Sequence, residues 1–190
     1  MARLRPAESV SEAIRVVAVM MASSTITAPK ARGIDLIETM IVDGDDLQIL
    51  ADAIEDKAKE QPAYLSKAYS MDAQNVRNSS SVLLIGVIGD PPKSEEPMNC
   101  GACGYKMCEQ LLAVRGRKGK EPGGPICTFQ AINLGIALGS AAKLASDLNV
   151  DNRIMYTIGD GAKKLRLLDS DIILGIPLSV TGKNIYFDRG

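Results

Sequence analysis

Cysteine spacing is the feature of this sequence with the clearest chemical meaning. Three of the four cysteines lie within residues 99–108 (NCGACGYKMC), and the fourth is Cys127. The spacing is Cys-x2-Cys-x4-Cys-x18-Cys, and the chain contains no histidine. Thiolates are soft donors that bind zinc and iron–sulfur clusters. The pattern therefore predicts one metal centre whose ligands are Cys100, Cys103, Cys108 and Cys127.

The same spacing distinguishes between metals. Structural zinc sites usually show two separate Cys-x2-Cys pairs, and this chain has one. Three closely spaced ligands with a remote fourth are typical of ferredoxin-type [4Fe–4S] sites, although the x4 gap differs from the bacterial Cys-x2-Cys-x2-Cys run. The plant-type [2Fe–2S] order, with x4 before x2, is reversed here. We favour a [4Fe–4S] cluster, and a [2Fe–2S] cluster, zinc, free thiols or a disulfide are the alternatives.

Two glycines are expected to help bind the cofactor. Gly101 and Gly104 flank Cys103, and glycine lets the backbone bend tightly around a bulky inorganic core. Their N–H groups can point at sulfur atoms, and hydrogen bonds to sulfur tune the potential of a cluster. We therefore count both glycines among the cofactor-binding residues.

Helix starts are expected at two of the ligands. A helix from Gly104 or Tyr105 to about Val114 places Cys108 in its first turn. Cys127 directly precedes a second, longer helix. The positive end of a helix dipole favours a thiolate or an anionic cluster. The sequence therefore predicts two helix N-termini converging on the metal centre.

Alternating helices and strands must position these residues. Apolar periodicity and capping residues predict helices over residues 9–23, 46–61, 63–76 and 129–150. Runs rich in β-branched residues predict strands over 35–42, 82–88, 153–158 and 171–176, with a short helix over 160–168. We expect a single domain, residues 1–190, of the α+β class with helices covering a sheet. The Gly- and Pro-rich segment 91–127 is expected to be an iron–sulfur insert within it.

Segment 129–150 is the strongest predicted helix. It is apolar almost all the way round, so we expect it to be buried. Its small residues leave space for another backbone, from the same chain or from a second copy, to approach closely. These residues are Gly135, Gly139, Ala142 and Ala145.

Composition excludes several classes of function. The net charge of −1, the pI of about 5.6 and the absence of Trp argue against nucleic-acid binding. Glu12 and Arg15 adjoin the apolar patch at residues 16–22, so we expect an amphipathic helix there rather than a signal peptide. We expect no segment long enough to span a bilayer and hence a cytoplasmic protein that binds no membrane. Stable disulfides are rare in the cytoplasm, which favours metal ligation by the cysteines.

The motif CGACGYKMC…C resembles the iron–sulfur modules of anaerobic redox enzymes. The whole chain resembles a family of uncharacterised prokaryotic ferredoxin domain-containing (4Fe–4S) proteins that are common in anaerobes. The resemblance covers nearly the full length and is carried by four stretches: STITAPKARGID, NCGACGYKMC, NLGIALGSAAKLASDLNVDNRIMYTIG and GIPLSVTGKNIYFDR. It implies an iron–sulfur redox protein.

The flanking segments resemble a distant nitroreductase fold. MASSTITAPKARG resembles the Ala-Pro-Ser loop of flavin nitroreductases, and AINLGIALGSAAKLASDL and ILGIPLS resemble their central helix and last core strand. This resemblance implies a nitroreductase-like, helix-covered mixed sheet and a chain that pairs into a homodimer. The chain departs from those enzymes at residues 8–15 (ESVSEAIR), which lack the Arg-Arg-Ser-x-Arg element that grips the flavin phosphate. An FMN-dependent oxidoreductase is therefore an alternative reading.

Two groups of cations are further candidates. Lys30 and Arg32, in APKARGID, occupy the phosphate-loop position of the resembled fold and are expected to bind an anionic cofactor or to form a polar turn. Four more cations lie between the third and fourth cysteines: Arg115, Arg117, Lys118 and Lys120. They predict either a docking patch for an acidic redox partner protein or a solvated loop.

The predicted function is electron transfer through the cluster, or the electron inlet of an oxidoreductase. Four protein ligands leave no open iron position, which favours electron transfer over Lewis-acid catalysis. Without histidine, neither a Ser-His-Asp nor a Cys-His arrangement is available. The alternatives are an FMN-dependent nitroreductase-type enzyme and a zinc-stabilised interaction module without enzymatic activity.

Overall fold

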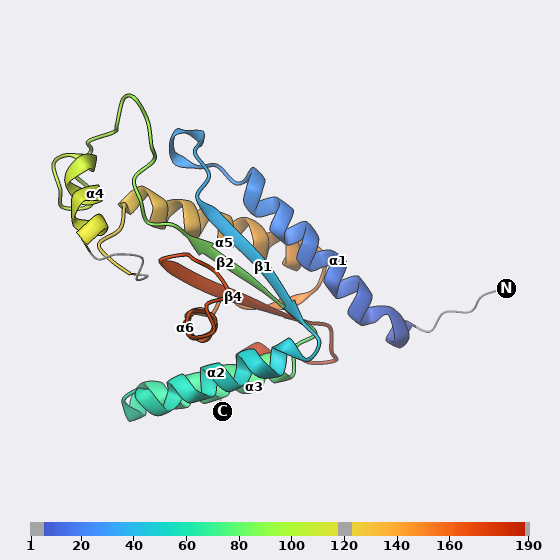
Figure 1. Cartoon of the computed structure of the whole chain (residues 1–190). Helices are drawn as coiled ribbons and strands as arrows, with labels where there is room; N and C mark the ends of the chain where they lie inside the picture. Colours follow the sequence, from blue (N-terminus) through green and yellow to red (C-terminus); the bar gives the residue numbers. More distant parts are fainter. Residues whose placement is uncertain (1–5, 118–122, 189–190) are drawn as a thin grey trace.

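Four strands form one open sheet in the order β1-β2-β4-β3. The computed structural model describes residues 6–117 and 123–188 (Figure 1). The strands are β1 (Ile37–Asp43), β2 (Ser81–Val87), β3 (Asp151–Asn152) and β4 (Ile172–Ser179). The pairings among these strands are all antiparallel, where we expected a mixed sheet. The predicted α+β class with helices covering the sheet is confirmed.

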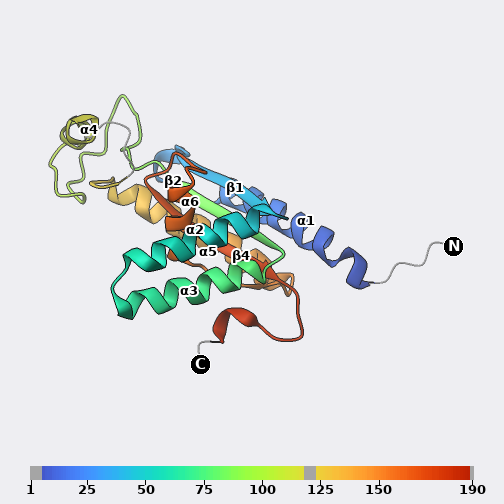
Figure 2. The same cartoon turned by 60° about the horizontal axis from the view of Figure 1, so that its bottom comes forward.

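Helices cover both faces of this sheet (Figures 1 and 2). One layer contains α1 (Pro6–Thr27) and α5 (Thr128–Asp147), which pack against each other. The opposite layer contains α2 (Asp46–Glu60), α3 (Ala63–Arg77) and α6 (Tyr156–Lys164). The short 3-10 helices are η1 (Ala31–Gly33) and η2 (Ile185–Phe187). Helix α4 (Cys108–Arg117) lies apart from both layers, beyond one end of the sheet.

Strand β2 is buried on both faces because it separates two hydrophobic cores. All seven of its residues are buried. Val82 and Leu84 pack with α2, α3 and α6, whereas Leu83 and Ile85 pack with α1 and α5. The continuous apolar run that predicted a strand over residues 82–88 thus has the expected cause.

The predicted strand over residues 153–158 is wrong. Strand β3 ends at Asn152, and α6 begins at Tyr156, four residues before the predicted helix start at 160. Ile158 is completely buried in α6 and packs in the core with α2 and β4. The helix approaches β4 closely because Gly159 has no side chain: a Cβ there would lie 1.7 Å from the carbonyl oxygen of Ile173.

Helix α5 is only half buried, which corrects the expectation that it is buried all round. Its inner face includes Leu134, and its outer face exposes Ile132 and Ile136 (47% and 39% exposed). A Cβ added at Gly135 or Gly139 would meet nothing within 4 Å. The close backbone approach that we expected at these glycines is therefore not made within the described chain.

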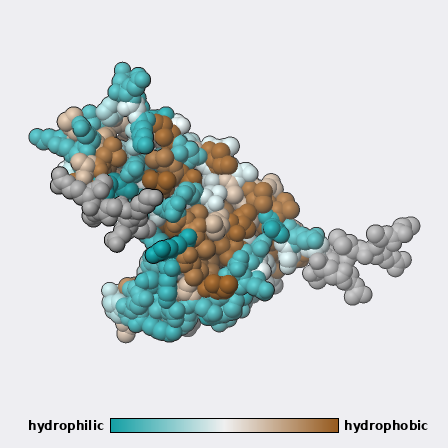
Figure 3. All heavy atoms as spheres, in the orientation of Figure 1, coloured by the Kyte–Doolittle hydropathy of each residue, from teal (hydrophilic) through white to brown (hydrophobic). Residues whose placement is uncertain are grey.

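Helix α1 has an apolar character on both sides. Ile14, Ala18 and Met21 are buried, while the outer side exposes Val16, Val19, Met20 and Ile26. In Figure 3, apolar side chains gather over the middle of the molecule, in the region of α1 and β1. Residues 9–27 have the length and apolar content of a membrane span, with 28% of that window buried. By those two criteria alone, the expectation that no segment is long enough was wrong.

Candidate metal centre

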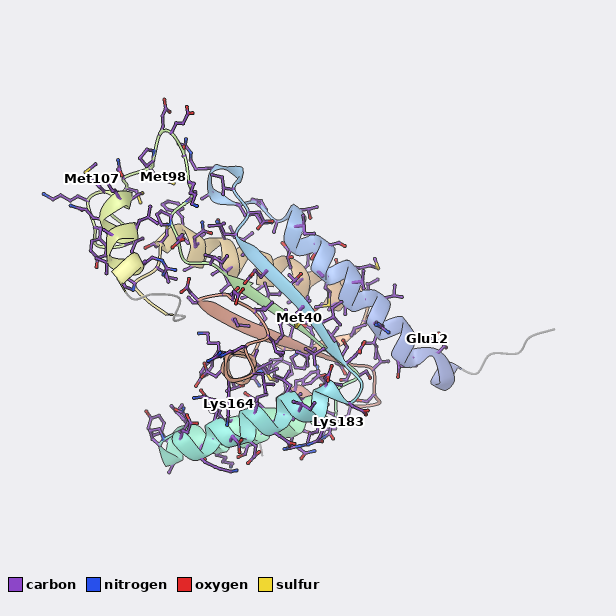
Figure 4. The ribbon with its side chains drawn as sticks, in the orientation of Figure 1. Glu12, Met40, Met98, Met107, Lys164 and Lys183 are labelled. Carbon is purple, nitrogen blue, oxygen red and sulfur yellow. The ribbon has the colours of Figure 1, made fainter. Side chains whose placement is uncertain are left out.

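The cysteine-bearing segment leaves the sheet at the end of β2 and returns at the start of α5. It forms a lobe at one end of the molecule, and α4 is the one helix in its described part (Figure 1). Met98 and Met107 both lie on this lobe in Figure 4 and are 36% and 47% exposed. The segment is therefore placed where a second protein can reach it.

All four cysteines line a single cleft in this lobe. The cleft has about 340 Å³ of empty space, part of it open to solvent. Its remaining walls are largely apolar and include Pro91, Pro92, Met98, Leu111 and Phe129. The four thiols are free, and their exposure decreases from Cys100, which is exposed, to Cys127, which is buried. The structure thus brings together the four predicted ligands.

Glycine bends surround Cys103 as expected. Gly101 and Gly104 have φ angles of 72° and 88°, in the left-handed region that favours glycine. The N–H of Gly104 donates to the carbonyl oxygen of Gly101 (2.9 Å), which closes a turn around Cys103. The backbone conformation predicted from these two glycines is therefore present, and their role in binding a cofactor stays a prediction.

Asn99 is a site residue that the sequence analysis missed. Its side-chain oxygen accepts a hydrogen bond of 2.8 Å from the backbone N–H of Cys108. Because Asn99 directly precedes Cys100, this bond ties the first ligand of the segment to the third. Cys108 is the first residue of α4, so this bond also satisfies one of the N–H groups that lack a partner within the helix. The sequence did contain a signal for this role, because an asparagine directly precedes the cysteine motif and a helix begins at the last cysteine of that motif.

Cys127 is held at the start of α5 by the backbone. It is the N-cap residue of this helix, and its N–H donates to the carbonyl oxygen of Gly89 (2.8 Å). Burial raises the pKa of the Cys127 thiol, and the nearby thiols of Cys103 and Cys108 raise it further. The backbone N–H groups at the start of α5 act in the opposite direction. The predicted placement of Cys127 at a helix start is confirmed.

The charged residues between the third and fourth cysteines do not form an exposed docking patch in the described part. The Arg115 side chain is 14% exposed and forms ion pairs with Asp90 (2.6 Å) and Asp171 (2.5 Å). Lys118 and Lys120 lie outside the described residues, as does the side chain of Arg117. Arg115 therefore has a structural role within the lobe.

Lys30 and Arg32 point in different directions. The Lys30 ammonium bonds to the carbonyl oxygens of Thr25 and Ile26 at the end of α1 and pairs with Asp35 (3.2 Å). Its side chain is 4% exposed. These three oxygens match the three N–H donors of an ammonium group, so none is left for a phosphate. Lys30 thus forms the polar turn that was the alternative expectation.

Arg32 instead contacts the cysteine segment. Its guanidinium donates to the Ser94 hydroxyl (2.9 Å), and Ser94 lies six residues before Cys100. The backbone N–H of Ala31 donates to the side chain of Asn133 on α5 (2.9 Å). Through these two bonds the turn around η1 is joined to both sides of the cysteine lobe.

Comparison with known proteins identifies the family. Residues 123–189 match the family described as "Uncharacterized protein containing a ferredoxin domain (DUF2148)". An uncharacterized protein from Archaeoglobus fulgidus is 44% identical over 179 residues, which cover 94% of this chain and 93% of the relative. The chain belongs to this ferredoxin-domain family. The predicted resemblance is confirmed, and the matched region of the ferredoxin-domain family includes Cys127.

Solved structures share the fold of this ferredoxin-domain protein. A nitroreductase family protein from Clostridium novyi has a TM-score of 0.53 at 15% identity, covering 90% of this chain and 78% of that one. The nitroreductase of Saccharomyces cerevisiae has a TM-score of 0.52 at 14% identity, covering 90% and 83%. The NADPH:FMN oxidoreductase of Vibrio harveyi has 0.51 at 11%, covering 88% and 60%. The predicted nitroreductase-like fold is confirmed.

Proposed function

We propose that this chain is an iron–sulfur redox protein in which Cys100, Cys103, Cys108 and Cys127 ligate one [4Fe–4S] cluster. The observation that carries the proposal is that four thiols from separate parts of the segment line one cleft. Membership of a ferredoxin-domain family supports an iron–sulfur redox role. The donor set fits the group, because four thiolates complete the coordination of a [4Fe–4S] cluster.

The spacing of the cysteines favours a cluster over zinc. Structural zinc sites usually show two separate Cys-x2-Cys pairs, and this chain has one. Three closely spaced cysteines with a remote fourth are typical of [4Fe–4S] sites. A zinc-stabilised interaction module is the weaker alternative.

The surroundings of the cysteines are suited to electron transfer. When bound, the cluster supplies a centre that gains and loses single electrons. Pro91, Pro92 and Leu111 are buried and limit the access of water to one side of the cleft. Cys100 is exposed, so an electron has a short route from a solvent-accessible sulfur ligand to a docked redox partner protein. We place the protein in the cytoplasm, where stable disulfides are rare and cysteines stay available as ligands.

A flavin enzyme is the second candidate, because the solved structures with this fold include an NADPH:FMN oxidoreductase. In that case the cluster serves as the electron inlet to FMN. The residues expected to bind the flavin phosphate do not fit this role well, since the donors of Lys30 are used within the chain. Arg32 remains exposed beside the lobe. Absence of released flavin after denaturation of protein purified in the presence of FMN rejects this candidate.

Substitution of the ligands tests the cluster proposal. The proposal predicts that anaerobically reconstituted wild-type protein is brown with broad visible absorption. Cys103→Ser and Cys127→Ser should each lose most of that absorption. Ser94→Ala is a matched control, because it lies in the same segment and lines no part of the cleft. Equal absorption in the wild type and both cysteine variants contradicts the assigned ligand set.

A further inference from the structure

Asp171 is a buried carboxylate that binds two separate parts of the cysteine segment. It lies directly before β4 and is 6% exposed. One oxygen accepts from the backbone N–H of Gly89 (2.6 Å), and the other accepts from the N–H of Gly123 (3.0 Å). Gly89 precedes the first three cysteines and Gly123 precedes the fourth. One side chain from the sheet therefore holds both ends of the segment.

Arg115 completes this arrangement from α4. It donates from Nη2 to Asp171 (2.5 Å) and from Nε to Asp90 (2.6 Å). Its Nη1 donates to the carbonyl oxygens of Gly123 (3.2 Å) and Pro125 (2.8 Å). The planar guanidinium thus joins three parts of the chain with directed bonds to two carboxylates and two carbonyl oxygens, a geometry that lysine cannot reproduce. We refer to Asp171 and Arg115 as the clamp.

The clamp is linked to the ligands by short covalent and hydrogen-bonded paths. Gly89 donates to Asp171 and accepts from the N–H of Cys127 (2.8 Å), so it connects the clamp to the fourth ligand. Arg115 lies in the helix that begins at Cys108. A Cβ at Gly89 would lie 2.4 Å from the side chain of Ile126, so the packing here is tight.

We propose that Asp171 and Arg115 are positioning residues that hold Cys108 and Cys127 in their cluster-binding arrangement before the cluster is present. The inference rests on the proposed iron–sulfur function. Without the clamp, fewer contacts order the long segment between β2 and α5, so more conformational entropy must be lost when the cluster binds. With the clamp, this entropy is lost during folding and not on cluster binding, so the cluster enters a formed site and leaves it slowly.

The first arm of the test uses the protein without a cluster. Hydrogen exchange is measured on peptides that contain the amides of Gly89, Gly123 and Cys127. The wild type should protect these amides from exchange. In Asp171→Asn they should exchange at least about tenfold faster, since one amide oxygen cannot replace two carboxylate oxygens. Strand β2 should exchange equally in both proteins. Unchanged exchange at all three amides overturns the proposal.

The second arm measures cluster release to an iron chelator after reconstitution. We expect Asp171→Asn and Arg115→Lys to release iron at least about tenfold faster than the wild type, with a shifted reduction potential. Asp72→Asn is the matched control: Asp72 is 4% exposed and accepts from Thr157, and both residues lie in the layer of α2, α3 and α6. Equal release from all four proteins overturns the clamp and leaves the cluster assignment intact. A wild type that takes up no iron and sulfide overturns both.

Discussion

The side-chain oxygen of Asn99 lies 2.8 Å from the backbone nitrogen of Cys108 and accepts its hydrogen. This bond closes the loop that carries Cys100 and Cys103 into a ring, because it joins two residues that are nine positions apart in the sequence. The third thiol is thereby fixed relative to the first two by a neighbouring side chain, independently of any metal. Asn99 itself has a φ of 44°, a conformation that asparagine tolerates better than most residues.

Replacing Asn99 tests the importance of this ring. Asn99→Ala removes the acceptor and places alanine in an unfavourable backbone conformation. We expect the reconstituted variant to lose iron to a chelator several-fold faster than the wild type. Asn78→Ala is the control, since Asn78 is an exposed residue at the end of α3 that accepts a side-chain bond from Gln74 (3.2 Å). Identical rates for the wild type and Asn99→Ala argue that the ring has no role in retention.

Acid should weaken the attachment of the lobe through Asp171. Burial raises the pKa of this carboxyl, but hydrogen bonds from Gly123, Gly89 and Arg115 outweigh burial and hold the pKa below its ordinary value of 3.8. Its contribution to stability is therefore fully present above pH 3.8 and is lost as the pH falls through the lower folded-state pKa.

Melting temperatures of the cluster-free protein, measured as the pH is lowered from above 3.8, test this loss of stability. The drop on acidification should be smaller in Asp171→Asn than in the wild type. Asp147→Asn, at an exposed pair with Lys143 on α5, should retain the wild-type drop. The same drop in all three proteins excludes Asp171 as its source.

The contact between α6 and β4 should not accept a side chain at Gly159. A Cβ there would lie 1.7 Å from the carbonyl oxygen of Ile173, so Gly159→Ala must displace backbone. We expect the free energy of unfolding to fall by about 3 kcal/mol, at the upper end for overpacked cores. Gly182→Ala, where a Cβ meets nothing within 4 Å, should change it by less than about 1 kcal/mol. Denaturant unfolding compares the two variants, and equal stabilities contradict the packing argument.

The outer face of α5 should form contacts between two copies of the chain. Ile132 and Ile136 are exposed beside Gly135 and Gly139, where no described part of the chain approaches. Small residues permit the close helix packing that a symmetric dimer needs. We expect sedimentation to show a dimer that Ile136→Lys converts to a monomer. Gln74→Lys, on the exposed side of α3, should remain dimeric, and a monomeric wild type contradicts the expectation.

Much of the fold follows from local patterns in the sequence. The continuous apolar run of β2 predicts a strand, and the apolar periodicity of α2 and α3 predicts helices. These predictions hold because the residues that set the pattern are the ones buried in the fold. The segment after residue 152 misled the prediction, since Ile154, Tyr156 and Ile158 alternate as in a strand. The helix forms there because Gly159 and Gly175 allow it to pack directly on β4. Such long-range complementarity has no local signal.

The candidate site likewise has parts that local sequence patterns predict and parts that only long-range contacts reveal. Cysteine spacing and glycines are local features, and they predicted the four thiols that line the cleft and the bends around Cys103. Asp171 could not be predicted, because it is more than forty residues from the last cysteine and acts through backbone contacts. Arg115 was interpreted as an exposed cation for the related reason that its partners, Asp90 and Asp171, meet it only in the folded chain.

Iron and acid-labile sulfide analysis of the anaerobically reconstituted 190-residue chain tests the central claim most directly. We expect about four irons and four sulfides per chain, with a visible absorption that a reductant changes reversibly. A colourless protein that instead retains one zinc ion per chain, or one that binds no metal, contradicts it.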